Sequence, residues 1–177
     1  MSNLTTTEKF SIVLGQTFDN MGIIIAELNQ AGKTDLNAAM VDVLKQFILS
    51  HDKNYLINSF INSSYEYWDR IKEKDEKCLM NNFDKIFGDY TNKPEFASVK
   101  LIFSSHIDEE AKSFVWSCLS SLVKLSISHV FEERGGSVQK VPISDGKFTI
   151  KISYKNKDAY PKIDIPKCNK LWDLKLY

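Results

Sequence analysis

The 177-residue sequence contains little glycine, proline or cysteine, and each shortage narrows the range of folds. There are seven glycines and four prolines, and none of the prolines precedes Pro94, so no proline interrupts a helix in the first ninety residues. The three cysteines, Cys78, Cys118 and Cys168, are widely spaced and odd in number. This pattern indicates free thiols in a reducing compartment rather than a disulfide framework.

No excess of one charge is present either, since 23 basic residues balance 23 acidic residues. This balance argues against a dedicated nucleic-acid binder, whose affinity comes largely from neutralising phosphates. The N-terminal residues MSNLTTTEKF lack the basic start and apolar run of a signal peptide. The most apolar stretch, residues 108–134, carries Lys124 and several serines, which disfavours a membrane span. We therefore expect an intracellular, cytoplasmic protein with no membrane span.

Motifs of known chemistry are missing as well. The sequence contains no G-x-x-x-x-G-K-[ST], G-x-G-x-x-G, G-x-S-x-G or C-x-x-C pattern. His51 and His106 lie beside aspartates that we interpret as helix caps, and His129 falls on the apolar side of a predicted helix. We therefore expect no catalytic residue, cofactor or metal. An enzyme or metal-dependent protein that uses His51, His106 or a cysteine is the third-ranked alternative.

The segment around which we expect the chain to be organised is residues 108–134. Asp108 is a good N-cap, and Arg134 precedes Gly135-Gly136, where glycine is the usual residue just past a helix end. Apolar residues surround most of this helix, and small serines form its polar stripe. A helix that is apolar nearly all round is typical of the inside of a bundle.

Shorter helices are predicted before this segment from apolar residues at spacings of three and four. The sequence Thr5-Thr6-Thr7-Glu8 has the spacing of a capping box and starts the first helix. The second helix is capped by Thr34 or Asp35 and the third, carrying residues 55–71, by Asp52. A polar run at 72–77 either extends the third helix or forms a tight joint. A fourth helix at 75–88 and a short helix at 96–103 complete the set.

After Gly136 the pattern changes from helix to strand. Residues 138–143 and 147–154 are the predicted strands, joined by an Asp145-Gly146 turn, and residues 147–154 alternate strictly between polar and apolar. A two-stranded hairpin is marginal alone, so its apolar residues must cover either the bundle or a partner. Residues 155–177 are interpreted as an irregular, lysine-rich arm. The candidate partner-binding residues are Phe148, Ile150, Ile152, Tyr154, Trp172 and Tyr177.

The predicted fold is mainly α: a bundle of five or six helices over residues 1–136, with a C-terminal β-hairpin and irregular arm over residues 137–177. The predicted function is a non-enzymatic protein–protein interaction or structural protein, acting through a protein partner or self-association as an oligomer. The alternative is a nucleic-acid-associated regulatory factor that uses the basic and aromatic residues of the arm, namely Lys155, Lys157, Lys162, Lys167, Lys170, Trp172, Lys175 and Tyr177.

The block from Tyr55 to Arg134 resembles a group of uncharacterised helical proteins of nucleocytoplasmic large DNA viruses. The similar features are the segment YEYWDRIKEKDEKCLMNNFDKIFGDY, with Trp-x-x-Ile-Lys-x-Lys-Asp at Trp68–Asp75, and the final helix FVWSCLSSLVKLSISHVFEERG. The resemblance covers under half of the chain and implies no catalytic residue. It implies a viral protein in an intracellular setting, either the virion or the cytoplasm of the infected host.

Overall fold

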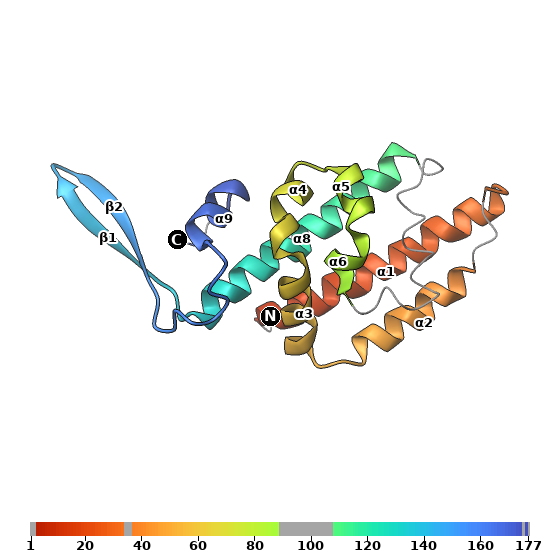
Figure 1. Ribbon diagram of the computed structural model, residues 1–177, viewed down its shortest axis with the longest axis horizontal. Helices are drawn as coiled ribbons and strands as arrows, with labels where there is room; N and C mark the ends of the chain where they lie inside the picture. Colours follow the sequence, from red (N-terminus) through yellow and green to blue (C-terminus); the bar gives the residue numbers. More distant parts are fainter. Residues whose placement is uncertain (1–2, 34–36, 89–107, 175, 177) are drawn as a thin grey trace. The chain divides into compact units, whose positions relative to one another are not determined.

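The computed structural model covers the whole chain and describes residues 3–33, 37–88, 108–174 and 176. Its fold is mainly α, with a two-stranded antiparallel hairpin near the C-terminus, which confirms the predicted fold class (Figure 1). Contacts divide the chain into two compact units, Met1–Ser126 and Ile127–Tyr177. This division lies ten residues before the boundary predicted at residue 136, so the end of the long helix belongs with the hairpin and arm.

The first unit begins with two helices that lie side by side, α1 (Thr6–Gln30) and α2 (Ala38–Leu49). The predicted capping box starts α1, since the Thr5 hydroxyl accepts from the Glu8 amide and the Glu8 carboxylate accepts from the Thr5 amide. The N-cap of α2 is Asn37, whose side chain accepts from the Ala39 amide at 3.0 Å. The prediction of a cap at residue 34 or 35 was therefore wrong, and both residues lie outside the described ranges.

The predicted third and fourth helices are each broken into shorter pieces. The pieces are α3 (Lys53–Ser64), the 3₁₀ turn η1 (Tyr65–Tyr67), α4 (Trp68–Lys72), α5 (Glu76–Asn81) and α6 (Phe83–Phe87). The polar run at 72–77 is the tight joint, because Lys74 has a left-handed φ of 56° and Asp75 then caps α5. Asn82 separates α5 from α6 by turning its side-chain amide back to the Cys78 carbonyl.

The long predicted helix is present as α8 (Glu109–Glu133), capped by Asp108, whose carboxylate accepts from the Ala111 amide at 2.8 Å. Gly135, with a φ of 58°, follows its last turn as predicted. Within the first unit, α8 supplies Val115, Leu119, Leu122 and Val123 to the core, and each is at most 2% exposed. The short helix predicted at 96–103 lies outside the described residues.

Among the described residues, α8 is also the one helix with the length and composition to cross a membrane. The mean hydropathy of its most apolar window is 1.4, and 56% of that window is buried inside the protein. A core helix of a bundle has the same length, hydropathy and burial, so these properties alone are weak evidence for a span.

The second unit contains the end of α8, the hairpin strands β1 (Ser137–Ser144) and β2 (Lys147–Ser153), and a short helix α9 (Ile165–Leu171). The predicted arm is therefore not wholly irregular. Asp164 caps α9 by accepting from the Lys167 amide at 3.1 Å, and Pro166 lies in the first turn, where it costs no helical hydrogen bond. The Asp-x-Pro spacing at 164–166 is a helix-start signal. We did not predict a helix there because the lysine-rich composition favoured an irregular arm.

Candidate functional site

The hairpin has one apolar face and one polar face. Its register pairs Pro142 with Phe148, Lys140 with Ile150 and Val138 with Ile152, and directly paired residues lie on the same face of the sheet. Five of these six side chains are apolar. The opposite face carries the Gln139–Lys151 and Val141–Thr149 pairs. The alternation predicted for residues 147–154 therefore produces a continuous apolar face along β2.

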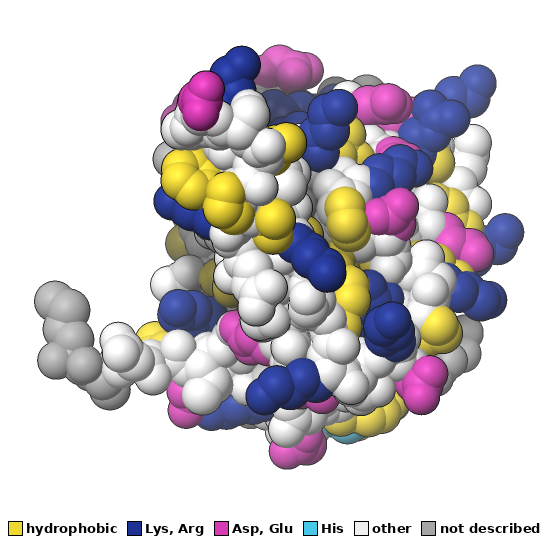
Figure 2. Space-filling view, turned by 90° about the vertical axis from the view of Figure 1, so that its left-hand side faces the viewer, with side chains coloured by type: hydrophobic (Ala, Val, Ile, Leu, Met, Phe, Trp, Pro, Cys, Tyr) yellow, Lys and Arg dark blue, Asp and Glu magenta, His cyan; other side chains and the backbone are white. Residues whose placement is uncertain are grey.

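This apolar face is open to solvent toward the tip of the hairpin. Phe148 is 60% exposed and Ile150 is 46% exposed, whereas Ile152, nearer the base, is half-buried. Ile143, in the irregular step before the turn, is 66% exposed. The view onto this end of the molecule shows hydrophobic side chains gathered in a band beside lysine and arginine side chains (Figure 2). Exposed neighbouring apolar side chains of this size are typical of an interaction surface.

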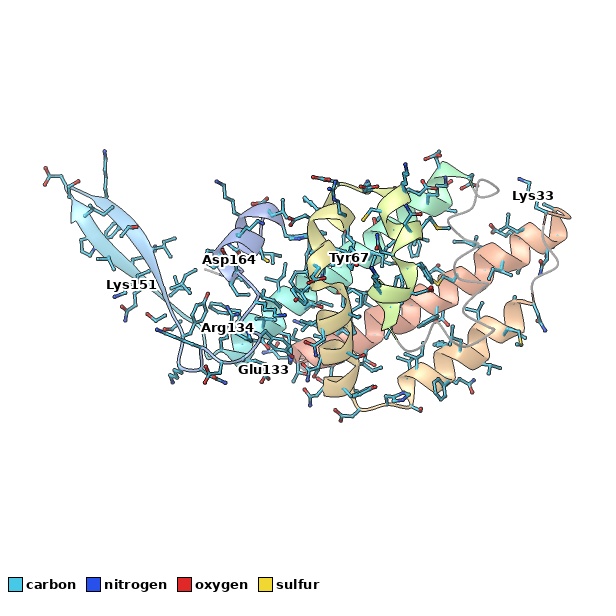
Figure 3. All side chains as sticks on the ribbon, viewed as in Figure 1. Lys33, Tyr67, Glu133, Arg134, Lys151 and Asp164 are labelled. Carbon is cyan, nitrogen blue, oxygen red and sulfur yellow. The ribbon has the colours of Figure 1, made fainter. Side chains whose placement is uncertain are left out.

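The base of the hairpin is held by Arg134, the residue just after α8 (Figure 3). Its guanidinium donates to the backbone carbonyls of Ala159 at 2.8 Å, of Ile163 at 2.7 Å and of Tyr160. Its own carbonyl accepts from the Asn156 amide at 3.0 Å. We call this set of contacts the Arg134 clamp. Because Arg134 is only 6% exposed, the clamp is an internal support for the loop that follows β2.

Tyr154 belongs to this support and not to the exposed face. The guanidinium of Arg134 lies 5.3 Å from the centre of the Tyr154 ring, and Phe131 meets the same ring edge-on at 6.4 Å. Tyr154 is half-buried. Its ring packs within its own unit, just after the end of β2, and its contact with a partner stays a prediction.

Tyr160 and His129 form a second buried contact in this unit. Their rings meet edge-on with centroids 6.3 Å apart, and His129 is 3% exposed. Burial raises the pKa of Tyr160 to about 12, with the Glu133 carboxylate adding to the shift. Burial lowers the pKa of His129, and Glu133 and Glu132 oppose this by smaller amounts. Both side chains are thus held neutral at pH 7 as packing groups.

The remaining candidate partner-binding residues fall outside the exposed face. Trp172, a candidate partner-binding residue, is 1% exposed, so its ring fills core space and does not belong to the exposed face. Tyr177 lies outside the described residues. Of the six predicted residues, Phe148 and Ile150 are the two that the structure brings to the surface side by side on one strand, with Ile152 partly accessible beside them.

Charge is distributed unequally between the two units. Residues 127–177 contain ten lysine and arginine residues against six acidic residues, a net charge of +4. Residues 1–126 contain 13 against 17, a net charge of −4. Within the hairpin, Lys140, Lys147 and Lys151 outnumber Asp145. The net charge of the chain is therefore zero because a basic C-terminal unit, which carries the apolar face, balances an acidic first unit.

The described residues offer less for chemistry elsewhere. His51 lies at the joint before α3, stacked on Tyr55 at 5.4 Å and edge-on to Phe47 at 5.3 Å; His106 lies outside the described ranges. No group of three or more histidine, cysteine, aspartate or glutamate side chains gathers in a metal-binding arrangement within residues 3–33, 37–88 and 108–174. Burial raises the pKa of the Cys118 thiol, which makes it a poorer nucleophile.

A partly open cavity in the first unit is lined by residues of α1, α2, α3 and α6. Its volume is about 50 Å³, and its lining includes Phe10, Phe18, Phe60 and Phe87. Ligand pockets usually measure several hundred cubic ångströms, about 300–1,000 Å³. This cavity is therefore a packing gap among aromatic side chains.

No protein-family model matches the chain, and no curated protein or solved structure is significantly similar to it.

Sequence reasoning missed Arg134 as a structural residue. It was interpreted as the basic end of a helix, whereas its three carbonyl acceptors lie 25 to 29 residues further along the chain. The signal available was a single arginine directly before Gly135-Gly136. Because the acceptors are backbone atoms of a distant loop, no pattern of side chains in the sequence predicts them.

Proposed function

We propose that this chain is a non-enzymatic interaction protein whose C-terminal hairpin contacts another protein through the apolar face of β2. The observation that carries the proposal is the exposure of Phe148 and Ile150, at 60% and 46%, as neighbours on one face. Burying each side chain against a partner would contribute roughly 1 kcal/mol or more from the area removed from water. The Arg134 clamp supports this reading, because a rigid base reduces the conformational entropy lost on binding.

The charges around this face select the chemistry of the partner. Lys140 lies on the apolar face beside Ile150, Lys147 and Lys151 lie on the opposite face of β2, and Asp145 at the turn is the one acidic residue of the hairpin. A complementary surface would present an apolar patch with a carboxylate that meets Lys140. The resemblance of residues 55–134 to proteins of nucleocytoplasmic large DNA viruses makes a viral component, in the virion or the infected cytoplasm, the setting that we propose.

The proposal is tested by site-specific photo-cross-linking in the cells that make the protein. Benzoylphenylalanine replaces Phe148 on the apolar face, and Thr149, on the opposite face of the same strand, is the matched control position. We expect a discrete adduct with a different protein from position 148 that is weak or absent from position 149, and that is lost when Ile150→Asp is added. No adduct with a different protein at position 148, or the same such adducts from both positions, would overturn the proposal, whereas an adduct between two copies of the chain is not counted.

A nucleic-acid-associated regulatory factor is the second candidate, favoured by the +4 charge of residues 127–177. The buried Trp172 removes one of the stacking groups on which this alternative was based. Binding of a single-stranded oligonucleotide at 50 mM salt that falls steeply by 200 mM salt would support it. In the photo-cross-linking experiment, nucleic-acid adducts in place of protein adducts would favour this candidate over the leading one.

A further inference from the structure

The two edges of the hairpin are not equivalent. Pro142 and the irregular step between Pro142 and Ser144 interrupt β1, and a proline cannot donate a backbone hydrogen bond to a neighbouring strand. The other strand, β2, is a regular seven-residue strand without proline. Its residues 147–151 are exposed. The outer edge of β2 is therefore the side of this sheet on which another strand can add.

The hairpin also has reason to add a strand. The sheet formed by the described residues has two strands, and an isolated two-stranded sheet is at best marginally stable in water. Exposed regular edges are normally protected by proline, bulges, inward-pointing charges or a covering element. On β2 the two lysines, Lys147 and Lys151, lie on the polar face and leave the apolar face uninterrupted. They therefore restrict the register of an added strand without preventing addition.

We propose that the added strand is β2 of a second copy of this chain, antiparallel and centred on Ile150. In this register Ile150 faces its own counterpart, Phe148 faces Ile152 of the other copy, and Thr149 faces Lys151. All apolar pairs then lie on one face and all polar pairs on the other, which is the arrangement that stabilises neighbouring strands. Lys147 faces Ser153, so no two lysines are directly opposed.

The neighbouring symmetric registers are disfavoured by charge. Moving the centre to Thr149 places Lys147 opposite Lys151, and moving it to Lys151 places that lysine opposite its own counterpart. Like charges directly opposite each other destabilise a strand pair. The centre at Ile150 is also the register in which all seven residues of β2 are paired. The lysine spacing thus specifies one register out of three.

The result is a symmetric dimer with a four-stranded sheet in the order β1–β2–β2–β1. A two-fold axis through Ile150, perpendicular to the sheet, relates the copies, so each contributes the same surface. The axis places both copies' Phe148, Ile150 and Ile152 on the same side, which doubles the apolar face. This inference deepens the proposed function and rests on it, because the doubled face is the surface offered to the other protein.

The test uses the full chain with single cysteines introduced on β2. In the proposed register the two Cα atoms at position 150 are about 4.5–5.5 Å apart, within the range of a disulfide. Residue 149 of one copy and residue 149 of the other are diagonal neighbours about 7–8 Å apart, and the same holds for residue 151. We expect Ile150→Cys to form a covalent dimer under mild oxidation, and Thr149→Cys and Lys151→Cys to form little alone. A mixture of those two variants should form the covalent heterodimer, and the unmodified chain gives the background from its native thiols.

Absence of the position-150 dimer, or equally efficient dimers from Thr149→Cys or Lys151→Cys alone, would overturn the proposal. A charge series adds an independent readout by light scattering. Thr149→Lys places a lysine opposite Lys151 of the other copy at two symmetric positions, and should raise the dimer dissociation constant about fivefold. Thr149→Glu places a glutamate opposite each Lys151 and should lower the dissociation constant by a similar factor. Equal effects from both substitutions would also contradict the register. A failed cysteine test with a surviving protein adduct at position 148 would remove the dimer and leave the proposed function in place.

Discussion

Single residues decide how firmly the second unit is held together, and the contrast between two arginines illustrates this. Arg134 is 6% exposed and donates to three backbone carbonyls. The side chain of Arg70 is 59% exposed and lies 3.4 Å from Glu73 and 3.6 Å from Asp75. Exposed ion pairs contribute little, whereas buried carbonyls left without a donor carry a full desolvation cost.

We therefore expect Arg134→Met to lower the free energy of unfolding by about 3 kcal/mol, because the buried Ile163 carbonyl and the partly buried Ala159 and Tyr160 carbonyls lose a charged donor. Urea denaturation followed by circular dichroism measures the loss, and hydrogen exchange at residues 156–163 should show it locally. Arg70→Met is the matched control and should change the stability by about 0.5 kcal/mol or less. Similar losses from both substitutions would show that the Arg134 clamp is not a main support.

The buried His129 predicts a pH dependence of stability. Burial holds its pKa below the ordinary value of 6.5, so the unfolded chain binds a proton more readily than the folded chain does. The contribution of neutral His129 is complete above pH 6.5 and is lost as the pH falls toward its lower folded pKa. We expect the urea concentration at the unfolding midpoint to decrease when the pH is lowered from 7.5 to 5.5. The decrease should be smaller in His129→Gln.

The control for this prediction is His51→Gln, which removes a histidine from the surface joint before α3 and keeps His129. It should retain the pH dependence of the unmodified chain. If His51→Gln flattens the dependence and His129→Gln leaves it unchanged, the buried histidine is not its source.

At the scale of elements, local backbone geometry decides where helices end. The apolar spacing of residues 55–71 and 75–88 predicts two helices, and the structure divides this region into α3, η1, α4, α5 and α6. The division occurs at Lys74, in the left-handed region, and at Asn82, whose side chain binds the Cys78 carbonyl. The spacing of three and four between apolar residues continues across such breaks, because each short helix still buries its apolar residues in the core.

The joint between α4 and α5 can be stabilised by a substitution at Lys74, since a left-handed backbone conformation costs a non-glycine residue roughly 1 kcal/mol. We expect Lys74→Gly to raise the free energy of unfolding by about 0.5 kcal/mol, once the greater freedom of unfolded glycine is subtracted. Lys77→Gly, in the first turn of α5, is the matched control and should lower it by about 0.5 kcal/mol. Urea midpoints distinguish the two, and a loss of equal size from both would contradict the conformational argument.

At the scale of the whole molecule, the separation of charge sets how association responds to salt. Each C-terminal unit carries a net charge of +4, so a dimer through β2 brings like charges together. Added salt screens this repulsion. We expect the dimer dissociation constant, from light scattering over a concentration series, to decrease by several-fold between 50 and 300 mM salt. A contact between a +4 unit and the −4 unit of another copy would weaken instead, and that trend would contradict pairing through β2.

The parts of the fold that depend on neighbours in the sequence were predictable from it. The Thr5–Glu8 capping box, the Asp52 and Asp108 caps and the Asp145-Gly146 turn each act over four residues or fewer, and the structure contains all of them. The break at Asn82 and helix α9 were not predicted. Their local signals, an asparagine within a periodic stretch and Asp-x-Pro within a lysine-rich tail, were weaker than the surrounding pattern.

By itself, the sequence determined the helical class, the long helix and a hairpin with one apolar face, because 3.6-residue and two-residue periods record which side of an element is buried. Only the tertiary structure decided which aromatic side chains are available to a partner. Phe148 and Trp172 are both large aromatic residues, yet one is 60% exposed and the other 1%. Burial depends on residues that approach from distant parts of the chain, as the loop held by Arg134 does, and no local pattern records those approaches.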